Sequence, residues 1–176
     1  YKSIAVKYAN DVVGGKKLAG KEVVLACQRF LDDLKRDDLE LRPIDPDFVI
    51  GIIEGVIVHK QGEDINGKSL VGKPLILQSW QVFIVYNLVG FYFKGTNERR
   101  FKEAFIFVPR KNGKTLFIAG LAWGLALLER KSGSKLYIVA GSMKQAQQSF
   151  EDIVYMLRYR GIIGKFRVRN NNAEHA

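Results

Sequence analysis

The spacing of apolar residues predicts helices in the first part of the chain and a mixture of strands and helices in the second. Residues 21–38 repeat apolar side chains at helical intervals, with Val24, Cys27, Leu31 and Leu34 on one face and charged residues opposite. The same reasoning, with stop and start signals, predicts helices over residues 4–13, ended by Gly14-Gly15, and over residues 47–59. We therefore expect residues 1–72 to form an amino-terminal helical segment.

The third of these helices has a competing interpretation. Residues 48–53, followed by Glu54, also resemble an apolar strand that delivers an acid to a magnesium ion. We reject that interpretation because Asp45-Pro46 is typical of a helix start, and because one acid follows rather than two. A further apolar helix is expected within residues 75–93.

The centre of the chain predicts a strand, a polar loop and a helix in that order. The three pieces are the apolar residues 104–108, the loop 109–115 (PRKNGKT) and the apolar residues 116–128. The closing Gly-Lys-Thr is the end of the phosphate-binding pattern G-x-x-x-x-G-K-[ST]. In that pattern Gly113 lets the backbone approach an oxygen and Lys114 reaches the β- and γ-phosphates. Thr115 offers its hydroxyl to Mg²⁺ at the positive end of the helix.

The match to this pattern is imperfect, since Val108 stands at the position of its first glycine. A basic surface turn is the alternative, because a bare Gly-Lys-Thr occurs by chance in many proteins. The context favours a phosphate loop: a strand precedes it, a helix follows it, and Arg110 and Lys111 within it suit a polyanion.

The chain after this helix predicts a second strand and a second helix. Residues 136–140 are apolar, and a helical crossover between two strands makes them a parallel pair. Ser142 and Gln145 have the S-x-x-Q form of a capping box at a helix start. We therefore expect an α/β fold, with a P-loop NTPase-type parallel sheet, incomplete here, in residues 73–176 behind the helical segment.

Composition narrows the class of partner. The net charge of +10, from 28 Lys and Arg against 18 Asp and Glu, indicates an acidic partner, and nucleic acid is the commonest one. A single cysteine excludes a disulfide within the chain, and the two histidines lie too far apart in sequence to suggest a metal site. The longest apolar runs fall short of the roughly 18 to 20 residues that cross a bilayer, so no membrane segment is expected.

Taken together, these segments resemble the large subunit of tailed-bacteriophage terminases, the ATP-driven motors that package double-stranded DNA into procapsids. The similarity extends over nearly the whole chain. The matching segments are residues 8–15 (YANDVVGG), 27–31 (CQRFL), 77–81 (LQSWQ), 99–101 (RRF), 108–115 (VPRKNGKT) and 140–146 (AGSMKQA). In that family the first glycine of the phosphate loop is typically replaced, so Val108 agrees with the family pattern.

The resemblance implies ATP and Mg²⁺ as cofactors and gives several residues a role. Lys114 and Arg110 would be catalytic, with Arg110 acting on the γ-phosphate from the same chain. Thr115 would hold Mg²⁺, and Gln81 would recognise adenine. The residues expected to contact nucleotide are Gln81, Pro109, Arg110, Lys111, Asn112, Gly113, Lys114 and Thr115.

The resemblance also implies partners, and a part of the protein that these residues do not contain. Double-stranded DNA, the portal protein and the terminase small subunit would be the partners of a homo-oligomeric ring in the cytoplasm of the bacterial host. No apolar run ending in Asp-Glu follows Thr115. We therefore expect the Walker B Asp, the catalytic Glu and the carboxy-terminal endonuclease domain to lie beyond residue 176. The fragment alone should bind nucleotide weakly and turn over little or none.

Two alternatives remain open at this point. One is a non-catalytic, basic DNA-binding or assembly module in which Gly-Lys-Thr is incidental. The other is a different P-loop enzyme, such as a helicase.

Overall fold

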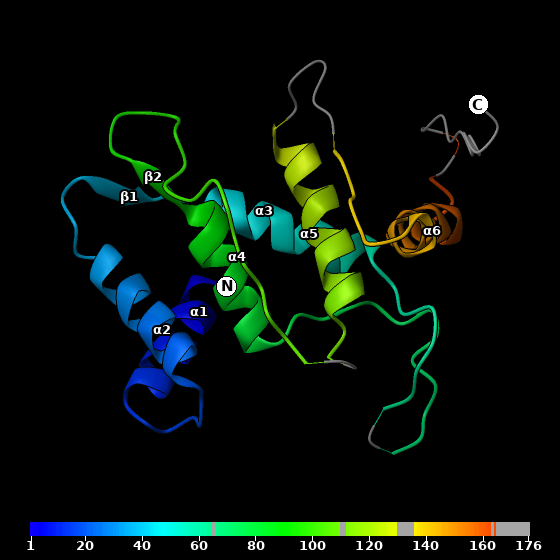
Figure 1. The fold of residues 1–176 in the computed structure, drawn as a ribbon, viewed down its shortest axis with the longest axis horizontal. Coiled ribbons are helices and arrows are strands. Elements are labelled where there is room, and N and C mark those ends of the chain that lie inside the picture. The colour runs from blue at the N-terminus through cyan, green and yellow to red at the C-terminus, as the bar shows by residue number, and fades with distance from the viewer. Residues whose placement is uncertain (65, 110–111, 130–135, 163, 165–176) are drawn as a thin grey trace.

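The computed structural model describes residues 1–64, 66–109, 112–129, 136–162 and 164. Helices make up most of this part of the chain (Figure 1). In chain order the elements are α1 (Lys2–Val13), α2 (Lys21–Asp33), β1 (Leu39–Leu41), α3 (Ile44–Val56), α4 (Ser79–Gly90), β2 (Phe91–Phe93), α5 (Lys114–Glu129) and α6 (Met143–Tyr159). None of the helices in the described ranges is long and apolar enough to cross a membrane.

Helices α1, α2 and α4 pack around four aromatic rings. Phe30 of α2 lies edge-on to Phe83 of α4 and to Phe91 of β2, with ring centroids 5.3 and 5.5 Å apart, and Tyr8 of α1 lies 5.3 Å from Phe83. The predicted helices over 4–13 and 21–38 are thus confirmed, although the second ends at Asp33. The predicted stop after the first is confirmed too, since α1 ends at Val13 with Gly14 as its C-cap, and Gly15 adopts a positive φ of 71°.

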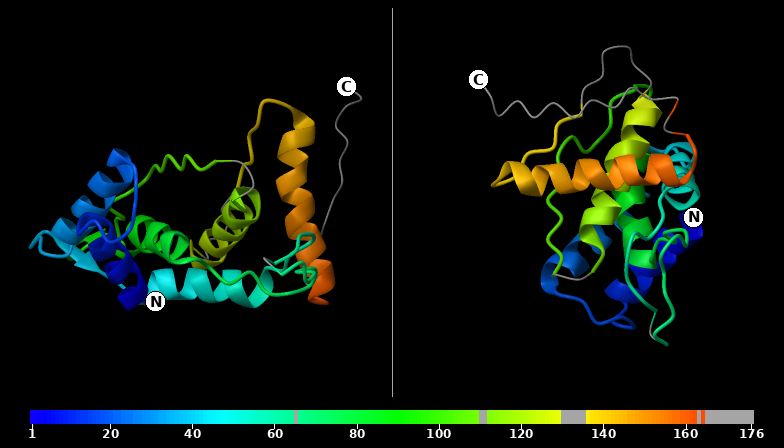
Figure 2. Two further views of the ribbon diagram at one scale, coloured as in Figure 1. Left: turned by 90° about the horizontal axis from the view of Figure 1, so that it is seen from below. Right: turned by 90° about the vertical axis from the view of Figure 1, so that its right-hand side faces the viewer.

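Helix α3 supports α5 through a close contact at two glycines. A Cβ atom at Gly120 would lie 3.1 Å from Ile57, and one at Gly124 would lie 2.9 Å from Val49. The two helix backbones therefore approach one another closely, and Figure 2 shows α5 standing over α3. Since α3 is helical from Ile44 to Val56, the strand interpretation of residues 48–53 is excluded.

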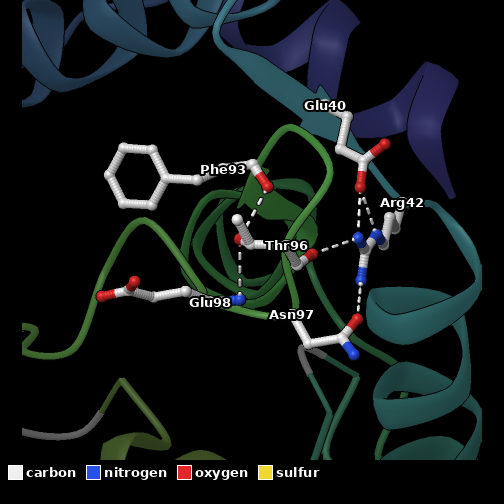
Figure 3. A network of polar contacts seen from close by, with 6 residues as sticks. All are labelled: Glu40, Arg42, Phe93, Thr96, Asn97 and Glu98. Atoms are coloured by element: carbon white, nitrogen blue, oxygen red, sulfur yellow. Dashed lines mark hydrogen bonds and ion pairs between the residues drawn. The ribbon is translucent and has the colours of Figure 1, made fainter.

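A short antiparallel pair of strands, β1 and β2, lies at the end of the molecule near α2. Strands β1 and β2 pair with Leu39 opposite Phe93, and Figure 3 shows the side chains that fix the turn after β2. The Arg42 guanidinium donates to the Thr96 carbonyl at 2.5 Å and to Asn97 Oδ1 at 3.0 Å, and it pairs with Glu40. The helix expected within residues 75–93 is present as α4, which ends at Gly90. The last three residues of the expected range, 91–93, form β2 instead.

Helix α6 returns to the amino-terminal half of the chain. Its N-cap Ser142 accepts a hydrogen bond through Oγ from the Gln145 N–H at 3.4 Å, which confirms the predicted cap. Farther along, Asp152 pairs with Lys60 at 3.5 Å, and the Arg160 Nε–H just past the helix donates to the Val56 carbonyl at 3.2 Å. Residues near the end of α3 are thereby joined to α6.

The expected parallel sheet is not present among the described residues, whose one sheet is the antiparallel β1-β2 pair. Residues 104–108 and 136–140 are irregular there, with Phe105 92% and Val139 91% exposed. Parallel strands are stable when neighbouring strands pair with them and helices cover both faces, and neither segment has a partner strand among the described residues. The mixture of helices with a small sheet is consistent with an α/β class, while the parallel P-loop sheet stays a prediction.

Candidate nucleotide-binding site

The predicted phosphate loop leads directly into α5. Gly113 adopts φ of +66°, a left-handed conformation that glycine accepts without steric cost, and its carbonyl accepts the Phe117 N–H at 3.0 Å. Lys114 is the first residue of the helix, and residues 112–115 are exposed. As at the start of any α-helix, the first N–H groups have no partner within the helix, so this end offers donors to an anion.

The loop before Gly113 is described only in part. Asn112 Nδ2 donates to the Pro109 carbonyl at 3.3 Å, which closes the loop across its base. The roles expected for Arg110 and Lys111 fall outside the described residues.

A contact between two rings brings the starts of α4 and α5 together. The Trp80 ring lies edge-on to the buried Phe117 ring, with centroids 5.9 Å apart. Trp80 is the second residue of α4 and Phe117 the fourth of α5, so the amino-terminal ends of both helices lie at the same end of the molecule (Figure 1). Gln81, next to Trp80, therefore lies in the first turn of α4, the turn that contacts the first turn of α5.

The Gln81 side chain takes part in starting its own helix. It is 4% exposed, and its Oε1 accepts the Gln78 N–H at 2.8 Å. An amide oxygen has two lone pairs and the amide NH₂ has two donors, so this contact alone does not use the whole hydrogen-bonding capacity of the side chain.

The predicted metal ligand, Thr115, lies exposed in the first turn of α5. Nowhere in the described ranges do three His, Cys, Asp or Glu side chains gather as metal ligands. One threonine hydroxyl is a single ligand for Mg²⁺, an ion that usually keeps several waters and takes its remaining ligands from carboxylates and phosphate oxygens.

A cavity of about 710 Å³ lies beside α4. It is bounded by α2, by residues 101–108 and by α4, where Trp80 and Asn87 line it. Asn87 Oδ1 is buried and accepts no hydrogen bond in the described part of the chain. The cavity therefore adjoins the helix that carries Gln81, on the side of the expected first strand.

An ion pair connects α2 with the chain that leads to the phosphate loop. Arg100 pairs with Asp33 at 2.7 Å, and Asp33 is 3% exposed. Burial raises the pKa of the Asp33 carboxyl, although the nearby Arg100 and Arg36 act in the opposite direction. Sequence reasoning noted residues 99–101 as part of the resemblance and did not find this contact, because Asp33 and Arg100 lie far apart in the chain.

Sequence reasoning also missed Glu54 as a contact of the Gln81 region. Its Oε1 accepts the Leu77 N–H at 3.0 Å, four residues before Gln81. No short-range pattern links two residues 23 positions apart, so only the fold shows the contact.

Comparison with known protein families gives one match. The profile of the terminase large subunit ATPase domain matches residues 79–171, more than half of the chain of 176 residues. The match begins at the first residue of α4 and includes Gln81, the loop 109–115, α5 and α6. No curated protein and no solved structure matches the chain.

Proposed function

We propose that this chain, which belongs to the terminase large subunit ATPase-domain family, carries the ATP-binding front part of a motor that packages double-stranded DNA. Family membership supports an ATPase and a role in DNA packaging. The observation that carries the proposed site is the start of α5. There a left-handed Gly113 leads into a helix beginning Lys114-Thr115, within the residues that match the family.

The residues at this helix start suit a nucleoside triphosphate. The first N–H groups of α5 and the Lys114 ammonium are exposed donors at one place, which is what a polyanion requires. Bound ATP with Mg²⁺ supplies the phosphoanhydride bond whose cleavage drives a motor. In our proposal Lys114 balances charge on the β- and γ-phosphates, Thr115 gives its hydroxyl oxygen to the metal, and Asn112 and Pro109 shape the loop.

Charge stabilisation accounts for most of what an enzyme does for phosphoryl transfer to water. We assign Arg110 to the γ-phosphate, in addition to Lys114. The Walker B Asp and the Glu that orients water are proposed to lie beyond residue 176, so a fragment of these residues alone should turn over little or no ATP. Gln81 is proposed to hold the adenine base, because its helix begins beside the start of α5.

The division into residues 1–72 and 73–176 and the parallel sheet belong to the same proposal. Residues 104–108 and 136–140 flank α5, and their large apolar side chains are exposed at Phe105, Phe107 and Val139. Strands of a parallel sheet bury such side chains on both faces. We propose that these segments pair in the complete ATPase domain.

The partners and place of action follow from the family and are proposed on that basis. They are double-stranded DNA, the portal protein, the terminase small subunit and other copies of the protein in a ring, in the cytoplasm of the bacterial host. The net charge of +10 supports contact with DNA phosphates, which would be independent of sequence and would weaken steeply with salt. A nuclease domain that cuts the packaged DNA is proposed to follow the ATPase domain.

Hydrolysis of ATP by the purified full-length protein, with and without blunt double-stranded DNA, tests this function. We expect Mg²⁺-dependent hydrolysis that DNA stimulates, without separation of the strands, and loss of hydrolysis in Lys114→Ala. Strand separation would favour the helicase alternative. Tight, salt-sensitive DNA binding with no hydrolysis in the wild-type protein would favour the non-catalytic DNA-binding module.

A further inference from the structure

Both carboxylate oxygens of Glu54 are occupied, and one of them holds the chain just before α4. Glu54 lies in the last turn of α3 and is partly buried. Its Oε1 accepts the Leu77 N–H at 3.0 Å, and its Oε2 accepts the Tyr1 hydroxyl at 2.5 Å. Leu77 is itself buried. Its backbone N–H therefore depends on the Glu54 acceptor, whereas an exposed N–H could donate to water instead.

Two consecutive backbone donors at the entry to α4 are held by side-chain oxygens. Glu54 of α3 holds the Leu77 N–H, and Gln81 Oε1 holds the Gln78 N–H at 2.8 Å. Helix α4 begins at the next residue, Ser79. The position of the Gln78 N–H, and with it the direction of the Gln81 amide, therefore depends on how Leu77 is held.

We propose that Glu54 is a positioning residue for Gln81 and so contributes to recognition of the nucleotide base. This inference rests on the proposed function, in which Gln81 contacts adenine. Glu54 does not touch the ligand itself. Its carboxylate fixes the turn from Leu77 to Gln78 against α3, the helix that also supports α5, so that the amide of Gln81 faces the base at a fixed place relative to the phosphate loop.

Ligands with and without a base separate this role from a general contribution to stability. In the full-length protein, dissociation constants are measured for ATP and for inorganic tripolyphosphate, which lacks the base, in wild type, Glu54→Ala, Glu54→Asp and Glu54→Gln. We expect the constant for ATP to rise about tenfold in Glu54→Ala and Glu54→Asp, as for loss of one well-placed hydrogen bond. The constant for tripolyphosphate should stay within about twofold.

The Gln variant provides the matched control. Glu54→Gln keeps an amide oxygen at the same reach and loses only the charge, so it should bind ATP nearly as wild type does. Glu54→Asp keeps the charge and moves the oxygens back by one methylene. If Glu54 acted through its charge alone, Glu54→Asp would bind ATP nearly as wild type does and Glu54→Gln would bind it weakly. That result would show the proposal to be wrong.

A double variant tests whether the effect passes through Gln81. If it does, Glu54→Asp combined with Gln81→Ala should bind ATP no more weakly than Gln81→Ala alone, since one interaction cannot be lost twice. Equal weakening of ATP and tripolyphosphate, or ATP binding as tight as in wild type, would overturn the proposal. If Glu54→Ala does not fold, the Asp and Gln variants decide.

Lys114→Ala separates this inference from the function on which it rests. If that variant binds both ligands as well as wild type does, the proposed nucleotide site itself is wrong. If it loses both ligands while Glu54→Asp binds ATP normally, only the role of Glu54 is wrong.

Discussion

The contact between α3 and α5 predicts that a single added methyl group at Gly124 will destabilise the protein. A Cβ there would lie 2.9 Å from Val49 Cγ1 and 3.4 Å from both the Val49 Cα and its carbonyl oxygen. Only the Val49 Cγ1 distance is too short, and Val49 is a buried, β-branched residue with one strongly preferred rotamer in a helix, so relief requires α5 to shift. Gly51 is the matched control, because it is exposed on α3 and a Cβ there would meet no atom within 4 Å.

Two effects of opposite sign set the magnitude. Alanine is favoured over glycine in a helix interior by about 1 kcal/mol, and this gain applies at both positions. Overpacking a tight contact typically costs about 1 to 3 kcal/mol. We therefore expect Gly51→Ala to stabilise the protein by about 0.5 to 1 kcal/mol and Gly124→Ala to destabilise it by about 1 kcal/mol.

Denaturant unfolding of both variants against wild type is the assay. Adding Val49→Ala to Gly124→Ala removes the atom at 2.9 Å, so the double variant should be more stable than the sum of the single variants by about 1 kcal/mol. The reasoning would be refuted if Gly124→Ala proved as stable as Gly51→Ala, or if the double variant were simply additive.

Three further predictions concern residues away from this contact. Arg100→Ala would leave the buried Asp33 carboxylate with only Arg36 at 3.9 Å as an ion-pair partner among the described residues. Denaturant unfolding should then show a free energy of unfolding lower by about 3 to 5 kcal/mol, and a loss under about 1 kcal/mol would contradict this. Burial raises the pKa of the Cys27 thiol from 9.0 to about 11, so folded protein should react negligibly with a thiol reagent at pH 8. Because the unfolded thiol ionises first, wild-type stability should fall relative to Cys27→Ala as pH rises from 9.0 to about 11; a constant difference would contradict this. Ser142→Ala removes the acceptor of the Gln145 N–H and should cost about 1 kcal/mol in thermal unfolding, whereas Ser142→Asp should largely retain stability.

The helices could be predicted from the sequence because their signals are local. The apolar stripe of α2, the Asp45-Pro46 signal in the first turn of α3 and the capping serine of α6 each act within a few residues, although α3 spans Ile44–Val56 rather than the expected 47–59. Element boundaries were less well predicted, since α2 ends at Asp33 rather than at residue 38. A prediction from helix propensity runs past the last turn that tertiary packing supports.

The strands could not be predicted in the same way, because a strand exists only when another strand pairs with it. Residues 39–41 are too short for an alternating pattern, and they pair with 91–93 across much of the chain. Residues 104–108 have the apolar composition of a strand, yet in the described structure they have no partner strand. Composition indicates that a segment can be buried and does not indicate what will bury it.

The candidate site likewise has residues that the sequence predicts and contacts that only the fold shows. Gly113, Lys114 and Thr115 could be identified from the sequence because a phosphate loop is a contiguous pattern, and the structure places them at the start of α5. The contact of Glu54 with Leu77 and the approach of Trp80 to Phe117 join distant parts of the chain, so they became visible only in the fold.

Equilibrium binding of ATP to the full-length protein and to Lys114→Ala tests the central claim most directly. The matched control is Lys35→Ala, at an exposed lysine after α2. If the start of α5 holds the phosphates, Lys114→Ala should weaken ATP binding by at least about tenfold while Lys35→Ala leaves it unchanged. Equal affinity in Lys114→Ala and in wild type would contradict the account.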